Sequence, residues 1–74
     1  MRTPTKEIVN SIREAYPCGC RVELLQMDDP YTRLVPGEKG TVAYVDDIGT
    51  IHVNWDCGSS LGVVYSEDSC RRID

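Results

Sequence analysis

The sequence predicts a mainly β protein, a small five-stranded barrel preceded by a short N-terminal α-helix. Residues 40–65 contain three short runs of alternating apolar residues, separated by two turn signals, which is typical of a tightly wound meander. A long connection rich in proline and glycine precedes them, and a short charged run follows. A flat meander would expose one apolar face, whereas rolling the sheet into a barrel buries that face.

The helix is predicted over residues 3–16. Thr3 suits the capping position, Pro4 suits the first helical position, and Glu7 favours the positive end of the helix dipole. An apolar stripe at helical spacing comprises Ile8, Val9, Ile12, Ala15 and Tyr16. We expect this stripe to pack on the barrel and to cover one open end. A helix that binds a partner is the alternative, because so short a helix needs packing from somewhere.

The barrel is predicted over residues 18–74. Its first strand is CRVELLQM, in which the alternation slips at Leu25 as it does at a bulge. The next connection, DDPYTRLVPGEKG, contains prolines and glycines that exclude a continuous strand, and its Pro36–Gly37 pair suits a type II turn. The last strand, CRRI, is predicted to lie at an edge, where its arginines resist the addition of further strands.

The first hairpin of the meander is predicted to turn through a four-residue loop at residues 46–49. Val42 then faces Val53 across the hairpin. Two positions on, Tyr44 faces Ile51. In this register, the side chains of Val42 and Tyr44 point to the same apolar face of the hairpin.

The second turn, at the sequence DCG, selects between two registers. A three-residue turn with Gly58 in a left-handed bulge pairs Trp55 with Ser59. That register gathers the apolar residues on one face, whereas a slip of one residue would reverse every side chain. The inward face is therefore predicted to hold Val42, Tyr44, Ile51, Val53, Trp55, Leu61 and Val63. Five short strands with a long first loop and tight hairpins describe an SH3-like barrel.

Seventy-four residues make a single domain, 1–74, and a domain of this size buries only about 60% of its unfolded surface. No apolar run approaches the roughly 20 residues of a membrane span, and the first residues lack the apolar core of a signal peptide. We therefore expect a cytoplasmic protein that does not engage a membrane.

The formal net charge is −4, from eight basic and twelve acidic residues, and the acids concentrate in the predicted sheet. Residues 28–68 hold eight of these acids against only Arg33 and Lys39. Such a surface repels phosphate backbones, which disfavours nucleic-acid binding. That alternative would require several arginines to converge on one patch, namely Arg13, Arg21, Arg33, Arg71 and Arg72.

The four cysteines allow three interpretations. Free thiols are favoured over a disulfide, because the sequence carries no secretion signal. Cys18 and Cys20 form a C-x-C pair, whereas tetrahedral zinc sites usually come from C-x-x-C knuckles. Cys57 and Cys70 stand alone. We expect no metal and no cofactor. The alternative function for these cysteines is a zinc or redox site.

Nothing in the sequence predicts catalysis. The only histidine, His52, alternates outward on its strand, with no acid or nucleophile at a fixed spacing to orient it. Glycine-rich phosphate loops and metal-binding motifs are absent from the sequence. Asp46 and Asp47 are interpreted as turn residues. We therefore expect no catalytic residue and a protein that is not an enzyme.

The blocks RVEL, MDDPYT, PGEKGTV, VDD-G-I-V-WD-GS-L and EDSCR together resemble domain-of-unknown-function family 4314. The resemblance covers about residues 16–73, nearly everything except the helix. It implies an SH3-like fold and an origin in bacteria, their phages or other mobile elements, and it implies no activity. The chain departs from the family pattern at Cys18, Cys20 and Cys57, which argues against a shared metal site. PG-KGTV followed by V-WD-G is also similar to other SH3-like barrels.

The candidate partner-binding residues are Asp28, Asp29, Tyr31 and Arg33 in the long connection, together with Trp55 on the central hairpin. Aromatic walls beside Asp28, Asp29 and Glu67 would suit a cationic or proline-rich peptide. The alternatives are that the aspartates cap a turn and that Trp55 and Tyr44 fill the barrel. We expect a non-enzymatic module that binds a protein or peptide, with phage counter-defence as one such role.

Overall fold

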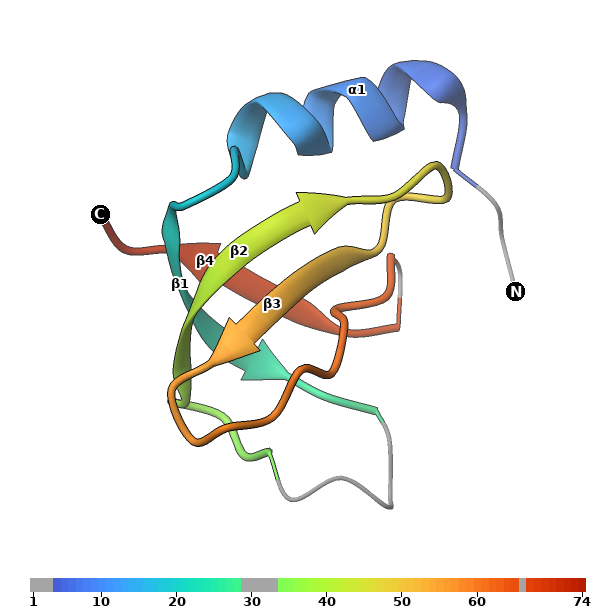
Figure 1. Cartoon of the computed structure of the whole chain (residues 1–74). Coiled ribbons are helices and arrows are strands. Elements are labelled where there is room, and N and C mark those ends of the chain that lie inside the picture. Colours follow the sequence, from blue (N-terminus) through green and yellow to red (C-terminus); the bar gives the residue numbers. More distant parts are fainter. Residues whose placement is uncertain (1–3, 29–33, 66) are drawn as a thin grey trace.

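The computed structural model describes residues 4–28, 34–65 and 67–74 of the 74-residue chain. One helix and four strands are formed: α1 (Lys6–Ala15), β1 (Arg21–Gln26), β2 (Lys39–Val45), β3 (Ile51–Trp55) and β4 (Ser69–Arg72). The strands twist strongly, and α1 lies across the end of β2 and the turn that joins β2 to β3 (Figure 1). The prediction of a mainly β protein with a short N-terminal helix is confirmed.

The helix begins later than the sequence predicted. Thr5 is the capping residue, and its side-chain oxygen accepts a hydrogen bond from the backbone N–H of Ile8 at 3.3 Å. Pro4 therefore precedes the cap, and the placement of Pro4 inside the helix is wrong. Thr3 lies outside the described residues. The choice between two threonines cannot be made from local preference alone, because both are good caps.

The predicted five-stranded barrel is not confirmed. The four strands form one antiparallel sheet in the order β3-β2-β1-β4, and the described residues leave it unclosed. Residues 59–65, expected to form a strand, contribute an isolated bridge between Ile51 and Val63. The last strand pairs with β1, as an edge strand should, so the open gap lies between residues 63–65 and β4.

The first hairpin departs from its predicted register at one point. Val42 faces Val53 as predicted, but an irregularity between Val42 and Tyr44 then pairs Tyr44 with His52. An extra residue of this kind turns the following side chain to the opposite face. Tyr44 is consequently 56% exposed, and its predicted place in the core is wrong.

The turns follow the sequence closely. The backbone N–H of Trp55 donates to the carbonyl oxygen of Ser59 at 2.8 Å, and Gly58 has a φ of 98°, which confirms the bulged turn. Gly37 has a φ of 101° in the predicted type II turn. The pairing of β1 with β4 shifts between Leu24 and Gln26, which confirms the bulge expected at Leu25.

The core lies on the inner face of the sheet. Its most deeply buried side chains are Val22, Leu24, Val42 and Val53, each at most 1% exposed. Gly40 makes the closest approach, because a Cβ at this position would lie 2.6 Å from Cγ1 of Val53 and 2.9 Å from the carbonyl oxygen of Asn54. Strands β2 and β3 can pack this tightly only with glycine there. In the described part of the chain, no helix is long and apolar enough to cross a membrane.

Candidate functional site

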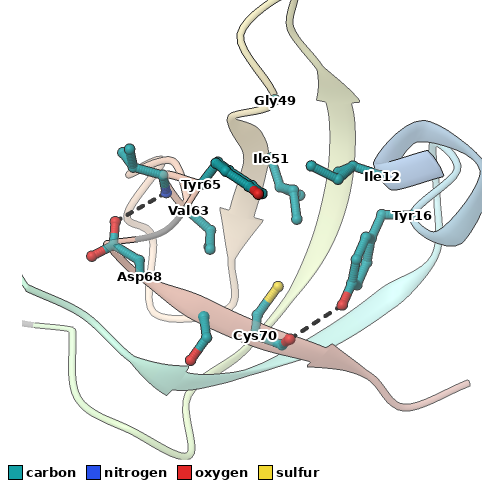
Figure 2. Close-up of a pocket in the computed structure, with 10 residues that line it drawn as sticks. Ile12, Tyr16, Gly49, Ile51, Val63, Tyr65, Asp68 and Cys70 are labelled. Atoms are coloured by element: carbon teal, nitrogen blue, oxygen red, sulfur yellow. Dashed lines mark hydrogen bonds between the residues drawn. The ribbon is translucent and has the colours of Figure 1, made fainter. Parts of the chain in front are cut away.

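An apolar cavity of about 200 Å³ occupies the gap where the sheet is not closed (Figure 2). We call it the seam cavity, and α1, β3, residues 63–65 and β4 surround it. Its lining residues are Ile12, Tyr16, Gly49, Ile51, Val63, Val64, Tyr65, Asp68, Ser69 and Cys70. Most of these side chains are apolar, and they come from segments far apart in the sequence.

The helix forms one wall of the seam cavity. Ile12 lies in α1, and Tyr16 is the residue that caps the end of the helix, with its backbone N–H donating to the carbonyl oxygen of Ile12. The hydroxyl of Tyr16 donates a hydrogen bond to the carbonyl oxygen of Cys70 in β4 at 3.2 Å, as Figure 2 shows. Arg13 fixes the same helix to the β2–β3 turn, since its guanidinium donates to the carbonyl oxygen of Val45 and to the carboxylate of Asp47.

The opposite wall is held by backbone hydrogen bonds. Ile51 and Val63 exchange N–H to carbonyl bonds of 3.0 and 2.8 Å, which keep residues 63–65 beside β3. Gly49 has a φ of 82°, and a Cβ there would lie 3.3 Å from Cδ1 of Ile12. The chain therefore turns close beneath the helix at this end of the cavity.

Cys70 places its sulfur in the seam cavity, directed toward the space between Ile51 and Tyr16 (Figure 2). Burial, which is the largest influence, and nearby Cys20 together raise the pKa of this thiol from 9.0 to about 11, and the interaction of its sulfur with the Tyr16 hydroxyl opposes them. A thiol with this pKa is protonated at neutral pH. Since the thiolate is the nucleophile, Cys70 is a weak one here.

A second hollow, of about 140 Å³, adjoins the seam cavity and is acidic. Asp28, Val64, Glu67 and Asp68 line it, and Val64 and Asp68 also line the seam cavity. We call its three carboxylates, those of Asp28, Glu67 and Asp68, the acidic mouth. The Asp68 carboxylate accepts hydrogen bonds from the backbone N–H groups of Asp28 (2.7 Å) and Val64 (3.0 Å), so it joins the two segments.

His52 has an acidic partner that the sequence analysis did not foresee. Its Nε2 lies 2.9 Å from a carboxylate oxygen of Asp46, and its ring stacks on that of Tyr44 with centroids 4.3 Å apart. The other Asp46 oxygen accepts from the backbone N–H groups of Ile48 and Thr50, which fits its predicted turn role. Burial would raise the pKa of this carboxyl, but the bonds from His52, Thr50 and Ile48 outweigh burial and lower it.

The described arginines are all paired with carboxylates. Arg13 pairs with Asp47, Arg21 with Asp56, Arg71 with Glu23 and Arg72 with Asp74. The convergent patch that nucleic-acid binding would need is therefore not formed by these four side chains. Arg33, the remaining arginine of that hypothesis, lies outside the described residues.

The cysteines are free thiols in this structure. Cys18 and Cys57 are exposed, Cys20 is 3% exposed, and Cys70 is half-buried. Burial raises the pKa of Cys20, the largest influence on that thiol. Within residues 4–28, 34–65 and 67–74, no group of three or more histidine, cysteine or acidic side chains is placed to hold a metal ion.

The sequence-predicted binding residues are placed unequally. Asp28 is exposed and stands in the acidic mouth, whereas Trp55 is 3% exposed and its indole N–H donates to the carbonyl oxygen of Leu61. Trp55 thus fills the core and is not available to a partner. This agrees with the alternative interpretation of Trp55 as a core residue and not with its prediction as a binding residue. Asp29, Tyr31 and Arg33 lie outside the described residues.

Sequence reasoning missed the seam cavity itself. The apolar stripe of α1 was the available signal, because Ile12 and Tyr16 belong to it and were assigned to ordinary packing. No local pattern shows that residues 63–65 and β4 fail to pair, since that gap depends on contacts over the whole chain.

A sequence model of a domain of unknown function, DUF4314, matches residues 5–73. The chain belongs to this family. The DUF4314 match includes α1, whereas the resemblance seen in the sequence begins at about residue 16. The helix is therefore part of the family domain. No curated protein and no solved structure matches the chain significantly.

Proposed function

We propose that this DUF4314 protein is a non-enzymatic module that binds a protein or peptide through the seam cavity. The observation that carries the proposal is an apolar cavity with an acidic mouth in the gap of an unclosed sheet. At about 200 Å³ the cavity is smaller than the roughly 300–1,000 Å³ of typical small-molecule sites, so it suits an anchoring side chain. Burying one such apolar side chain contributes about 1.5–3 kcal/mol.

The chemistry of the cavity supports recognition rather than reaction. Cys70, the thiol in the cavity, has a pKa of about 11 and is therefore mostly protonated at neutral pH. The dyad of His52 and Asp46 lies elsewhere, because Ile51 lines the cavity and its neighbour His52 points to the opposite face of β3. Among the described residues, the ring of His52 is bonded to Asp46 and to no serine, threonine or cysteine side chain.

We also propose that the fold is an SH3-like barrel. The order β3-β2-β1-β4, with residues 59–65 beside β3 and the last strand beside the first, supports an SH3-like barrel opened at one seam. In this interpretation, the cavity exists because the fourth run of the barrel bonds β3 at Ile51 and not β4. Nucleic-acid binding is disfavoured by the paired arginines. A zinc site is disfavoured because the described residues hold no group of three or more potential ligands, and a redox site because the pKa values of Cys20 and Cys70 are raised.

The phage or mobile-element origin, including a role in counter-defence, stays a prediction from the family resemblance. The genes that flank this one would test it, since phage genes and ribosomal genes would point to different partners. A cytoplasmic location likewise stays a prediction.

The test is selection of binding peptides from a displayed library of random short peptides. Ile12→Trp and Cys70→Trp each place a large ring in the cavity, from the helix and from β4 respectively. Glu14→Trp adds the same ring on the exposed side of α1 and is the matched control. Peptides that bind the wild type and Glu14→Trp, and neither cavity variant, support the proposal. Circular dichroism melts show that each variant is folded.

Two outcomes would contradict the proposed function. Enriched peptides that bind the cavity variants as well as the wild type would place the binding surface elsewhere. Failure of the folded wild type to enrich any peptide would remove peptide binding as the role of the cavity.

A further inference from the structure

The seam cavity and the acidic mouth form one continuous surface. Val64 and Asp68 line both hollows, so a chain that enters one passes directly beside the other. The cavity wall is apolar, with Ile12, Ile51 and Val63 among its lining residues. The surface therefore changes from apolar to acidic within the length of a short peptide.

The charge of this surface is of one sign. Three of its lining residues are acidic, Asp28, Glu67 and Asp68, and no lysine or arginine is among the described residues that line either hollow. Elsewhere the described acidic side chains often meet an arginine, as Asp47 and Glu23 do. Within the described parts of the chain, the mouth therefore has a negative potential that no lining arginine or lysine cancels.

The three acidic side chains of the mouth differ in their structural roles. Asp68 accepts backbone hydrogen bonds with both carboxylate oxygens, so its position is fixed by the fold. Asp28 and Glu67 are exposed, and within the described parts of the chain neither carboxylate forms an ion pair. No cationic side chain of the described residues competes for these two carboxylates, so they can meet a cation brought by a partner.

We propose that the seam cavity and the acidic mouth together recognise a peptide segment in which an aliphatic side chain is followed closely by lysine or arginine. The aliphatic side chain enters the cavity, and the basic side chains pair with Asp28 and Glu67. This inference rests on the proposed function and adds the chemical class of the partner. The apolar contact supplies affinity, and the charges supply selectivity and a faster association.

The test uses three labelled synthetic peptides that differ only in their core, Leu-Lys-Lys, Leu-Glu-Glu and Ser-Lys-Lys, with binding followed by fluorescence anisotropy. At low salt we expect the wild type to bind Leu-Lys-Lys about tenfold more tightly than Leu-Glu-Glu, which is what two exposed charge contacts supply. The ratio should fall in high salt because the contacts are exposed. Ser-Lys-Lys should bind far more weakly, since it lacks the anchor.

Charge reversal sharpens the test. Asp28→Lys together with Glu67→Lys should invert the preference, so that Leu-Glu-Glu becomes the better ligand. Glu7→Lys together with Glu14→Lys makes the same change in net charge on the exposed side of α1 and should leave the preference unchanged. Asp68 is kept in every variant because the fold depends on it.

The outcomes separate this inference from the proposed function. If the two leucine peptides bind equally and Ile12→Trp abolishes both, the cavity is a binding site and the basic partner is wrong. If Ser-Lys-Lys binds as well as Leu-Lys-Lys, or Ile12→Trp changes nothing, both are wrong. Sedimentation analysis tests whether a second copy of the chain fills the cavity instead. A wild-type dimer that Ile12→Trp dissociates would show this and would overturn the inference.

Discussion

Two surfaces of this DUF4314 domain carry acidic side chains in contrasting settings. On the outer sheet surface, Glu23 and Asp56 are each paired with an arginine from another strand or turn. At the acidic mouth, Asp28 and Glu67 have no such partner among the described residues. Among the described residues, therefore, two carboxylates that no arginine neutralises stand beside an apolar cavity.

The core of the bonded strands and the seam differ in packing. Val22, Leu24, Val42 and Val53, on the inner side of the bonded strands, are at most 1% exposed. Around the seam, side chains such as Tyr16 and Cys70 are only partly buried against this core. We therefore expect the bonded strands to provide most of the stability, whereas the seam leaves apolar surface only partly covered.

The largest expected effect separates the two regions by stability. Leu24→Ala should lower the free energy of unfolding by about 2–5 kcal/mol, because it leaves a cavity at a fully buried position. Ile12→Ala should cost clearly less, since its side chain already faces a cavity. Urea unfolding followed by circular dichroism measures both. Equal losses would show that the seam is as important to folding as the bonded strands.

The thiol of Cys70 in the seam and the thiols on the outer surface should differ in reactivity. A rise of the Cys70 pKa from 9.0 to about 11 leaves roughly hundredfold less thiolate at pH 8. We therefore expect an aromatic disulfide reagent to modify the exposed Cys18 and Cys57 quickly and Cys70 slowly, with the slow rate rising as pH approaches 11. Cys57→Ser should remove one fast thiol and Cys70→Ser one slow thiol. Four equal rates would contradict the burial of Cys70.

Acid should weaken the β2–β3 turn. The pKa of Asp46 is lowered in the folded protein by bonds from His52, Thr50 and Ile48, which outweigh the opposing effect of burial. The ionised carboxylate therefore stabilises the fold above its ordinary pKa of 3.8, and this contribution is lost as pH falls through the lower folded value. Asp46→Asn should cost roughly 1 kcal/mol at pH 7. Its difference from the wild type should shrink below pH 3.8, and a constant difference would be evidence against this account.

The smallest expected effect belongs to the paired surface. Arg71→Gln removes the cross-strand pair with Glu23 between β4 and β1 and should cost about 0.2–1 kcal/mol, as exposed ion pairs do. It should leave peptide binding unchanged. Glu67→Gln should do the reverse, with little change in the melting temperature and weaker binding of basic peptides. If Arg71→Gln weakened binding more than Glu67→Gln, the division between the two surfaces would be wrong.

The turns and the inward face of the sheet could be predicted from the sequence because local rules determine them. Gly58 and Gly37 adopt the left-handed conformations that their turns require, and the slip at Leu25 appears as a bulge. Trp55 occupies the core, as its place in the apolar alternation indicates. Alternation and turn chemistry are properties of adjacent residues, so one sequence suffices to read them.

The features that the sequence did not reveal depend on contacts between distant segments. The irregularity before Tyr44 exposes that ring beside His52, and alternation alone would have placed it inside. The failure of residues 59–65 to pair with β4 opens the seam, although their composition suits a strand. Asp28 was predicted as a binding residue, but its neighbour in the mouth, Asp68, is 40 positions away.

The hydrogen bond between Tyr16 and Cys70 joins segments that are 54 residues apart. Contacts over such a separation form slowly, because the intervening chain must first be ordered. We therefore expect the β2–β3 hairpin to appear early during folding and the walls of the cavity to come together last. In a nascent chain, the walls of the cavity could therefore come together only after β4 had emerged from the ribosome.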